Sequence, residues 1–330
     1  MSPRKLKASE MVLEILKERS KKALGFARRA ILGEKIESEK IREALEYYTS
    51  SWEIFTHPGF FSIACEAVGS NPDKAVKVQA AIAMLTAALD IHDDIIDKSD
   101  VKHGRPTVFG KFGQDIALLL GNAFFVSGVT LLGKSMAELP TEKAREIFET
   151  IKKSMFEVGN AHALELDSKG KMDVIPEKYM QILEMKAVSV ETSMRLGAIM
   201  GGGTESEIEV LTKYGRILGI LATLREEFID VFEIQELHQR LQNECLPIPI
   251  LYALQGENSG RIQELLLKKR VIGKDVDKLL DIVFETKEVK KLKRKMESLI
   301  TYACNMTLQI KNRQIRYLLT QLVTTALEDL

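Results

Sequence analysis

Apolar residues recur every three or four positions along most of this chain, over long stretches that contain no proline. No proline lies between Pro176 and Pro247, and none follows Pro249. A period near 3.6 residues is typical of helices, whereas the period-two alternation of strands is almost absent. The pattern predicts an all-α fold with roughly ten or more helices and no sheet.

Several helix starts are marked by capping residues. Asn71 precedes a proline that can occupy the first helical position, and Thr204 and Glu207 have the spacing of a capping box. Further starts are predicted near Thr141 and Pro176, and breaks near Ser259 and Gly273 are predicted to divide the C-terminal part of the chain. Because neither an internal repeat nor a low-complexity linker interrupts the pattern, residues 1–330 are predicted to form a single domain.

A helix that begins near Val78 and is apolar nearly all round ends in the first acidic cluster. This cluster comprises Asp90, Asp93, Asp94 and Asp97. The spacing places the carboxylates on one helical face over two turns, where they repel one another and need compensating cations. Mg²⁺ takes oxygen ligands and keeps several waters, which suits such a group. The alternative is a solvated helix end whose acidic residues have no common function. The apolar residues that precede the cluster argue against such a surface helix.

The second acidic cluster comprises Glu226, Glu227 and Asp230 and repeats the acid-acid-x-x-acid spacing. It also ends an apolar helix, with the sequence YGRILGILATL. A glutamate-rich helix face alone is usually solvated, but two such helices facing each other would form a carboxylate-lined cavity. Metal ions held there could bridge a diphosphate and neutralise the charge that develops as it leaves.

The composition indicates which binding partners are disfavoured and in which cellular compartment the protein is expected. The chain has 47 basic and 47 acidic residues, so no net field favours nucleic acid or an acidic membrane. Three cysteines without CxxC spacing indicate reduced intracellular thiols. Neither a signal peptide nor a run of about 18 apolar residues is recognisable, so a soluble, cytoplasmic protein without a transmembrane segment is expected.

The motifs together resemble the trans-isoprenyl diphosphate synthases, the polyprenyl synthetase family that includes farnesyl and geranylgeranyl diphosphate synthases. The resemblance extends from about Trp52 to Ala253 and rests on DDIID with KHGRPTVFGKFG, GQDIALLLGNAFF, YMQILEMKA, YGRILGILATLREEFID and LPIPILYAL. It implies a helical bundle around a deep central cavity, usually a homodimer. It also implies that Mg²⁺ assists ionisation of an allylic prenyl diphosphate, whose carbocation alkylates isopentenyl diphosphate.

The resemblance assigns the residues for ionisation. The implied metal ligands are Asp93, Asp94 and Asp97, together with Glu226, Glu227 and Asp230. The two glutamates replace aspartates of the family, which would shift the metal positions. Lys102 matches a basic residue that contacts the allylic diphosphate. Lys186 matches the lysine of a lysine-threonine pair, although the threonine is Ala187 here.

In the family that the chain resembles, the residues four and five positions before the first aspartate of the first acidic motif, here Asp93, limit the length of the prenyl chain. These are Leu89 and Ala88, which would form the floor of the cavity for the prenyl tail. Because Ala88 is small, the pocket is expected to accept a tail longer than farnesyl, unless Leu89 or a neighbouring helix closes it.

The residues that would bind the acceptor substrate, isopentenyl diphosphate, differ from those of the family. Ile54, His57, Thr86, His103 and Asn243 stand where polar or cationic residues are expected, and the segment between the second acidic cluster and Leu246 is short. Charge-assisted hydrogen bonds contribute about 1.5–3 kcal/mol each, so losing three costs on the order of 5 kcal/mol. At acidic pH, protonated His57 and His103 could partly replace the cations that are expected at their positions.

Three functions remain open from the sequence. The first is a prenyltransferase whose isopentenyl diphosphate site is non-standard or is restored by other residues such as Arg225 or Lys111. The second is a non-catalytic or regulatory subunit that pairs with a complete, related synthase. The third is a terpene-cyclase-like enzyme that ionises its substrate without isopentenyl diphosphate. The sequence does not decide the acceptor, the product length or the oligomeric state.

Overall fold

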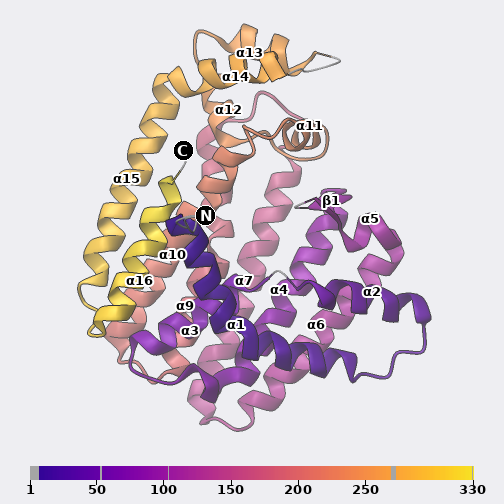
Figure 1. The fold of residues 1–330 in the computed structure, drawn as a ribbon, viewed down its shortest axis with the longest axis vertical. Helices are drawn as coiled ribbons and strands as arrows, with labels where there is room; N and C mark the ends of the chain where they lie inside the picture. Colours follow the sequence, from indigo (N-terminus) through magenta and orange to yellow (C-terminus); the bar gives the residue numbers. More distant parts are fainter. Residues whose placement is uncertain (1–6, 53, 103, 269–272, 329) are drawn as a thin grey trace, which may run out of the picture. The chain divides into compact units, whose positions relative to one another are not determined.

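A computed structural model describes residues 7–52, 54–102, 104–268, 273–328 and 330 of the chain (Figure 1). These residues form sixteen α-helices, two short 3-10 helices and one two-stranded ribbon. The prediction of an all-α fold with ten or more helices is therefore confirmed. The prediction of no sheet is wrong at one place, because Val101–Lys102 and Arg105–Pro106 pair as antiparallel strands β1 and β2. Strands of two residues are too short to leave a period in the sequence.

The first half of the chain contains α1 (Ala8–Leu32), α2 (Glu39–Ser50), α3 (Thr56–Ala67), η1 (Pro72–Ala75), α4 (Val76–Ile96), α5 (Val108–Phe112), α6 (Gln114–Met136) and α7 (Thr141–Leu166). The second half contains α8 (Pro176–Lys186), α9 (Val188–Met200), α10 (Glu205–Ile229), α11 (Ile234–Asn243), α12 (Ile248–Ala253), α13 (Ser259–Leu266), α14 (Gly273–Glu285), α15 (Lys287–Thr307), α16 (Arg313–Thr324) and η2 (Thr325–Leu327).

The predicted helix starts are confirmed. The Asn71 side chain accepts a hydrogen bond from the Asp73 N–H, although the turn that follows is 3-10 rather than α. Thr204 and Glu207 form both bonds of the capping box, at 2.9 and 3.3 Å. Helices α7 and α8 begin at the two further predicted starts, and α13 and α14 begin at Ser259 and Gly273, where breaks were predicted.

The chain divides into two compact units. Unit 1 comprises Met1–Lys152, Thr192–Thr212 and Ile310–Arg316, and unit 2 comprises Lys153–Glu191, Lys213–Gln309 and Tyr317–Leu330. The division falls inside α7, α9, α10 and α16. The prediction of a single domain over residues 1–330 stays a prediction.

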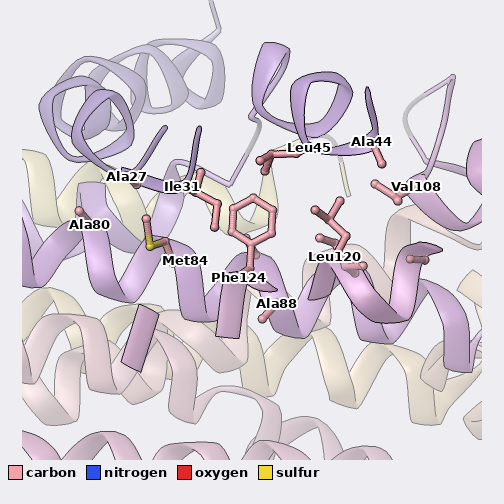
Figure 2. Close-up of a cluster of buried hydrophobic side chains, with 13 residues drawn as sticks. Ala27, Ile31, Ala44, Leu45, Ala80, Met84, Ala88, Val108, Leu120 and Phe124 are labelled. Atoms are coloured by element: carbon pink, nitrogen blue, oxygen red, sulfur yellow. The ribbon is translucent and has the colours of Figure 1, made fainter. Parts of the chain in front are cut away.

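The core of unit 1 lies where α4 packs on α6, with α1 and α2 contributing to it. Figure 2 shows Phe124 and Leu120 of α6 beside Met84 and Ala88 of α4, in a buried cluster that also includes Leu45. Alanines on α4 allow α6 to approach closely. Ala88 is completely buried in this cluster, and Leu89 is half-buried. Their role as the floor of a tail cavity stays a prediction.

Glycine is required where α6 crosses the end of α4. A Cβ added at Gly121 would lie 2.4 Å from His92 Nε2, whereas one added at Gly133 on the same helix would have nothing within 4 Å. We therefore expect Gly121→Ala to lower the free energy of unfolding by about 1–3 kcal/mol through overpacking. Gly133→Ala is the matched control, and we expect it to raise that free energy by up to about 1 kcal/mol through helix propensity. Equal effects in urea unfolding followed by circular dichroism would contradict this account of the crossing.

Unit 2 has its own core, in which α12 packs against α8, α14 and α15. Tyr179, Tyr214 and Phe228 are among its completely buried side chains. The ring of Phe228 stacks on that of Phe284, with the centroids 6.0 Å apart. This core fixes the C-terminal end of α10, where the second acidic cluster lies.

Two helical stretches in the described residues, Pro72–Ile96 and Gln114–Met136, are long and apolar enough to cross a membrane by length and composition. The core helix of a soluble protein passes the same test, and 67% of the apolar 18-residue window of the first stretch is buried inside the protein, against 33% of that of the second. The prediction that the chain has no transmembrane segment stays a prediction.

Candidate functional site

The first acidic cluster gathers around one lysine in unit 1. Lys102 Nζ lies 2.6 Å from Asp94 Oδ1, 3.3 Å from Asp90 Oδ1 and 3.9 Å from Asp93 Oδ2. Asp97 caps the end of α4, where its N–H donates to the carbonyl oxygen of Asp93. The structure therefore brings Lys102 together with three of the four carboxylates that the helical spacing placed on one face, those of Asp90, Asp93 and Asp94.

The ribbon positions Lys102 by folding back onto the end of α4. Gly104 has a φ of 74°, a left-handed conformation that lets Lys102 and Arg105 pair across the ribbon. The Thr107 N–H then donates to the carbonyl oxygen of Asp100 at 2.9 Å. A Cβ added at Gly110 would lie 2.1 Å from that oxygen, so glycine permits the close approach of α5. The pairing of β1 with β2 thus returns a cation to the end of α4.

Burial governs the charges of this cluster. Asp94 is 4% exposed, and burial raises its pKa to about 7, while Lys102 opposes the shift and Asp90 and Asp93 add to it. Burial lowers the pKa of Lys102, but the three carboxylates together raise it above the ordinary value. Lys102 therefore stays protonated, and one cation faces three carboxyl groups.

The first acidic cluster fits Mg²⁺, because its carboxylate oxygens are suitable ligands and Lys102 does not compensate all of their charge. Among the described residues, no three or more His, Cys, Asp or Glu side chains are arranged to hold a metal ion by themselves. Mg²⁺ is commonly held through one or two carboxylates, with waters and substrate phosphates completing the shell. Asp93 and Asp94, with Asp97 on the next turn, would supply such a partial set.

A cavity of about 240 Å³ in unit 1 borders Asp90, Asp94 and Lys102. Its other lining residues are Tyr47, Tyr48, Ser51, Ile54, Thr56, Arg105, Pro106, Thr107 and Val108. The lining joins apolar side chains to a few polar groups, which is typical of small-molecule sites. The buried carboxylate and the lysine are therefore accessible to a ligand from this side.

Arg105, Tyr47 and Tyr48 are cavity residues that sequence reasoning missed. The Tyr48 hydroxyl lies 3.5 Å from Asp90 Oδ2. The Arg105 guanidinium lies 4.0 Å from the Tyr47 ring centroid and donates to the Tyr47 carbonyl oxygen at 3.0 Å. The one available signal was Gly104, since a turn there places Arg105 opposite Lys102. Lys111 Nζ also lies over the Tyr47 ring, at 3.8 Å.

The residues predicted at the acceptor position have different environments in the structure. Ile54 lines the cavity. His57 Nδ1 lies 3.1 Å from Ser193 Oγ, and the Thr86 hydroxyl donates within its own helix to the Ile82 carbonyl oxygen. Asn243 ends α11 in unit 2. His103 lies outside the described residues.

The second acidic cluster lies in unit 2 and has a different environment. Glu226 is exposed, whereas Glu227 is only 5% exposed. Glu227 Oε1 accepts from Arg240 Nη2 at 2.6 Å, and Oε2 accepts from the Ile248 N–H at 2.8 Å. Asp230 is also paired with Arg240. Both oxygens of Glu227 are in use, so its arrangement does not fit a Mg²⁺ ligand.

Two predicted substrate-binding residues are engaged within unit 2. Lys186 forms an ion pair with Glu165, a partner that the sequence did not indicate. Arg225 Nη1 donates to the carbonyl oxygens of Thr325 at 3.1 Å and Glu328 at 2.5 Å. Arg225 thus holds the C-terminal segment in the structure, and its role in binding an acceptor stays a prediction.

Comparisons with known proteins agree with these features. The family model for polyprenyl synthetase matches residues 38–283. A short chain isoprenyl diphosphate synthase of Methanothermobacter thermautotrophicus is 29% identical over 68% of this chain and 68% of its own length. Geranylgeranyl pyrophosphate synthase 11 of Arabidopsis thaliana is 30% identical over 74% of this chain and 72% of its own.

The fold has close structural counterparts. The crystal structure of geranylgeranyl pyrophosphate synthetase from Pyrococcus horikoshii superposes with a TM-score of 0.83 at 22% identity, covering 98% of this chain and 99% of that one. That of the Geoglobus acetivorans synthetase gives 0.81 at 21% identity, covering 95% and 99%. The extent of the family match, together with the fold and the acidic helix ends, shows that this chain belongs to the polyprenyl synthetase family.

Proposed function

We propose that this protein is a Mg²⁺-dependent prenyltransferase-type enzyme that binds and ionises an allylic prenyl diphosphate for isoprenoid chain elongation. The observation that carries the proposal is the gathering of Asp90, Asp93 and Asp94 around Lys102 at the edge of a cavity. Membership of the polyprenyl synthetase family supports the class of reaction.

The residues of unit 1 can be given roles on physical grounds. Asp93, Asp94 and Asp97 would offer oxygens to Mg²⁺, which when bound neutralises charge on a leaving diphosphate. Lys102 has three donors on a compact charge and would bind diphosphate oxygens directly. The contact between Lys186 of unit 2 and a diphosphate, which the resemblance implies, stays a prediction. Apolar side chains of the cavity, such as Ile54 and Val108, would keep water from the allylic cation.

The proposed acceptor site is non-standard. Ile54 offers the cavity an apolar side chain and no charge, so isopentenyl diphosphate would lack a cation at this position, although Lys102 and Arg105 line the same cavity. The same observation favours a second candidate function, a non-catalytic or regulatory subunit that tunes a related synthase. A cyclase-like reaction, which needs no isopentenyl diphosphate, is the third candidate.

Calorimetric titration of the protein with a non-ionising thio-analogue of an allylic diphosphate tests the proposal. We expect binding with Mg²⁺ present and a loss of at least about tenfold in affinity after chelation, because diphosphate charge is then compensated only by side chains. Affinity that is the same with and without Mg²⁺ would contradict the proposed metal dependence.

One exposed face of helix α6 and the free cysteines bear on assembly and location. Helix α6 exposes Leu118, Leu119, Phe125, Val126 and Val129 in unit 1, and apolar patches of this kind mark protein interfaces. We propose a homodimer, or a heteromer with a related synthase, through this face. Three free cysteines support a cytoplasmic location.

A further inference from the structure

The C-terminal end of α10 is held to its neighbours by one buried arginine. Arg240 of α11 is 4% exposed. Its Nη2 lies 2.6 Å from Glu227 Oε1, its Nη1 binds Asp230, and its Nε donates to the Cys245 carbonyl oxygen at 2.9 Å. All three guanidinium nitrogens are engaged, and two of them bind carboxylates of the second acidic cluster.

Glu227 has no oxygen directed at solvent. Oε1 lies 3.3 Å from the Tyr179 hydroxyl in addition to Arg240, and Oε2 accepts from the Ile248 N–H. Tyr179 is itself completely buried and receives a hydrogen bond from Arg240 at 2.9 Å. Because Mg²⁺ retains several waters and demands near-ideal geometry, it could reach Glu227 only if this network opened.

The charge of Arg240 is fixed. Burial lowers its pKa, but Glu227, Tyr179 and Asp230 together raise it well above the ordinary value, so the guanidinium stays protonated. Removing one member of a buried ion pair leaves the charge of the other uncompensated.

The cation of the first acidic cluster is more accessible, since the Lys102 side chain is 39% exposed and borders a cavity.

We propose that Arg240 is the permanent counter-cation of the second acidic cluster and takes the place that a divalent ion would hold between Glu227 and Asp230. These two residues are then positioning residues, which fasten the end of α10 to α11 and α12. Divalent ions are left to the first acidic cluster. The inference rests on the proposed function only for that last statement.

Titration with Mn²⁺ alone, followed by the electron paramagnetic resonance signal of the free ion, tests the proposal. We expect Glu227→Gln to bind Mn²⁺ within about twofold of the unchanged protein. Asp93→Asn with Asp94→Asn should weaken binding about tenfold or more, because even the loss of an outer-shell partner typically costs that much in metal affinity. Arg240→Gln leaves two uncompensated carboxylates and is expected to bind additional Mn²⁺. Arg240→Lys, which keeps the charge, is the matched control and is expected to bind none in addition.

Thermal unfolding of the same variants gives a second readout. Because a ligand that binds only the folded state stabilises it, Mn²⁺ should raise the unfolding midpoint of Arg240→Gln more than that of Arg240→Lys. The proposal is overturned if Glu227→Gln weakens Mn²⁺ binding tenfold or more, or if Arg240→Gln gains neither binding nor stabilisation. If Glu227→Gln lowers the folded fraction, Asp230→Asn replaces it in the binding test, because Asp230 is less buried, and the same result is expected. Unchanged Mn²⁺ binding in the double variant of the first cluster would instead contradict the proposed function.

Discussion

Replacing Asp93 and Asp94 together with alanine is expected to abolish Mg²⁺-dependent binding of an allylic diphosphate. Both carboxylates lie within 4 Å of Lys102 Nζ, and Asp94 borders the cavity. Two charge-assisted contacts are worth about 3–6 kcal/mol together, so the affinity should fall by roughly two to four orders of magnitude. Calorimetry with the thio-analogue, with and without Mg²⁺, measures the loss.

Asp100→Asn is the control for that experiment. Asp100 is an exposed acid on the same connection, and its main chain rather than its side chain accepts the bond from Thr107. We expect it to bind the analogue as the unchanged protein does. If the double alanine variant is folded and still binds the analogue with undiminished affinity, the first acidic cluster is not the metal site.

Exchanging Ile54 for lysine and His57 for arginine is expected to recover part of the missing acceptor affinity. The unchanged protein should bind isopentenyl diphosphate weakly while binding the allylic analogue well, because Lys102 and the first acidic cluster are intact. A lysine at the cavity wall restores a charge-assisted bond of about 1.5–3 kcal/mol, or roughly a 10- to 150-fold gain in affinity. His57→Arg must first give up the contact with Ser193, so the second substitution should add less.

Ile54→Met is the matched control, since it changes shape without adding charge. It should leave the affinity for isopentenyl diphosphate unchanged within about twofold, because it conserves volume and adds no charge-assisted bond. Micromolar binding of isopentenyl diphosphate by the unchanged protein, together with steady chain elongation, would contradict the non-standard acceptor site.

Much of unit 1 could be predicted from the sequence because local signals determine it. The period of apolar residues identified α4, and the spacing of Asp90, Asp93 and Asp94 placed their carboxylates on one face. Lys102 was identified by resemblance, and its contact with the acids follows from the turn at Gly104. Each of these signals acts over a few residues, which is the range that sequence patterns resolve.

The environment of the second acidic cluster could not be predicted, because its partners come from other helices. The spacing of Glu227 and Asp230 matches that of the first cluster, yet Arg240 and the Ile248 N–H satisfy these acids in the structure. Arg240 lies in LHQRLQNE, a polar sequence with no sign of burial. Ala88 is a similar case, since its complete burial depends on how α6 packs against α4.

Product analysis of the purified protein tests the central claim most directly. The protein would be incubated with Mg²⁺ and each allylic diphosphate in turn, with and without isopentenyl diphosphate, and every product identified. We predict Mg²⁺-dependent release of diphosphate from at least one allylic substrate, lost in the Asp93→Ala, Asp94→Ala variant, with little elongation by isopentenyl diphosphate. Absence of any Mg²⁺-dependent product from every allylic diphosphate would contradict the claim that this site ionises such substrates.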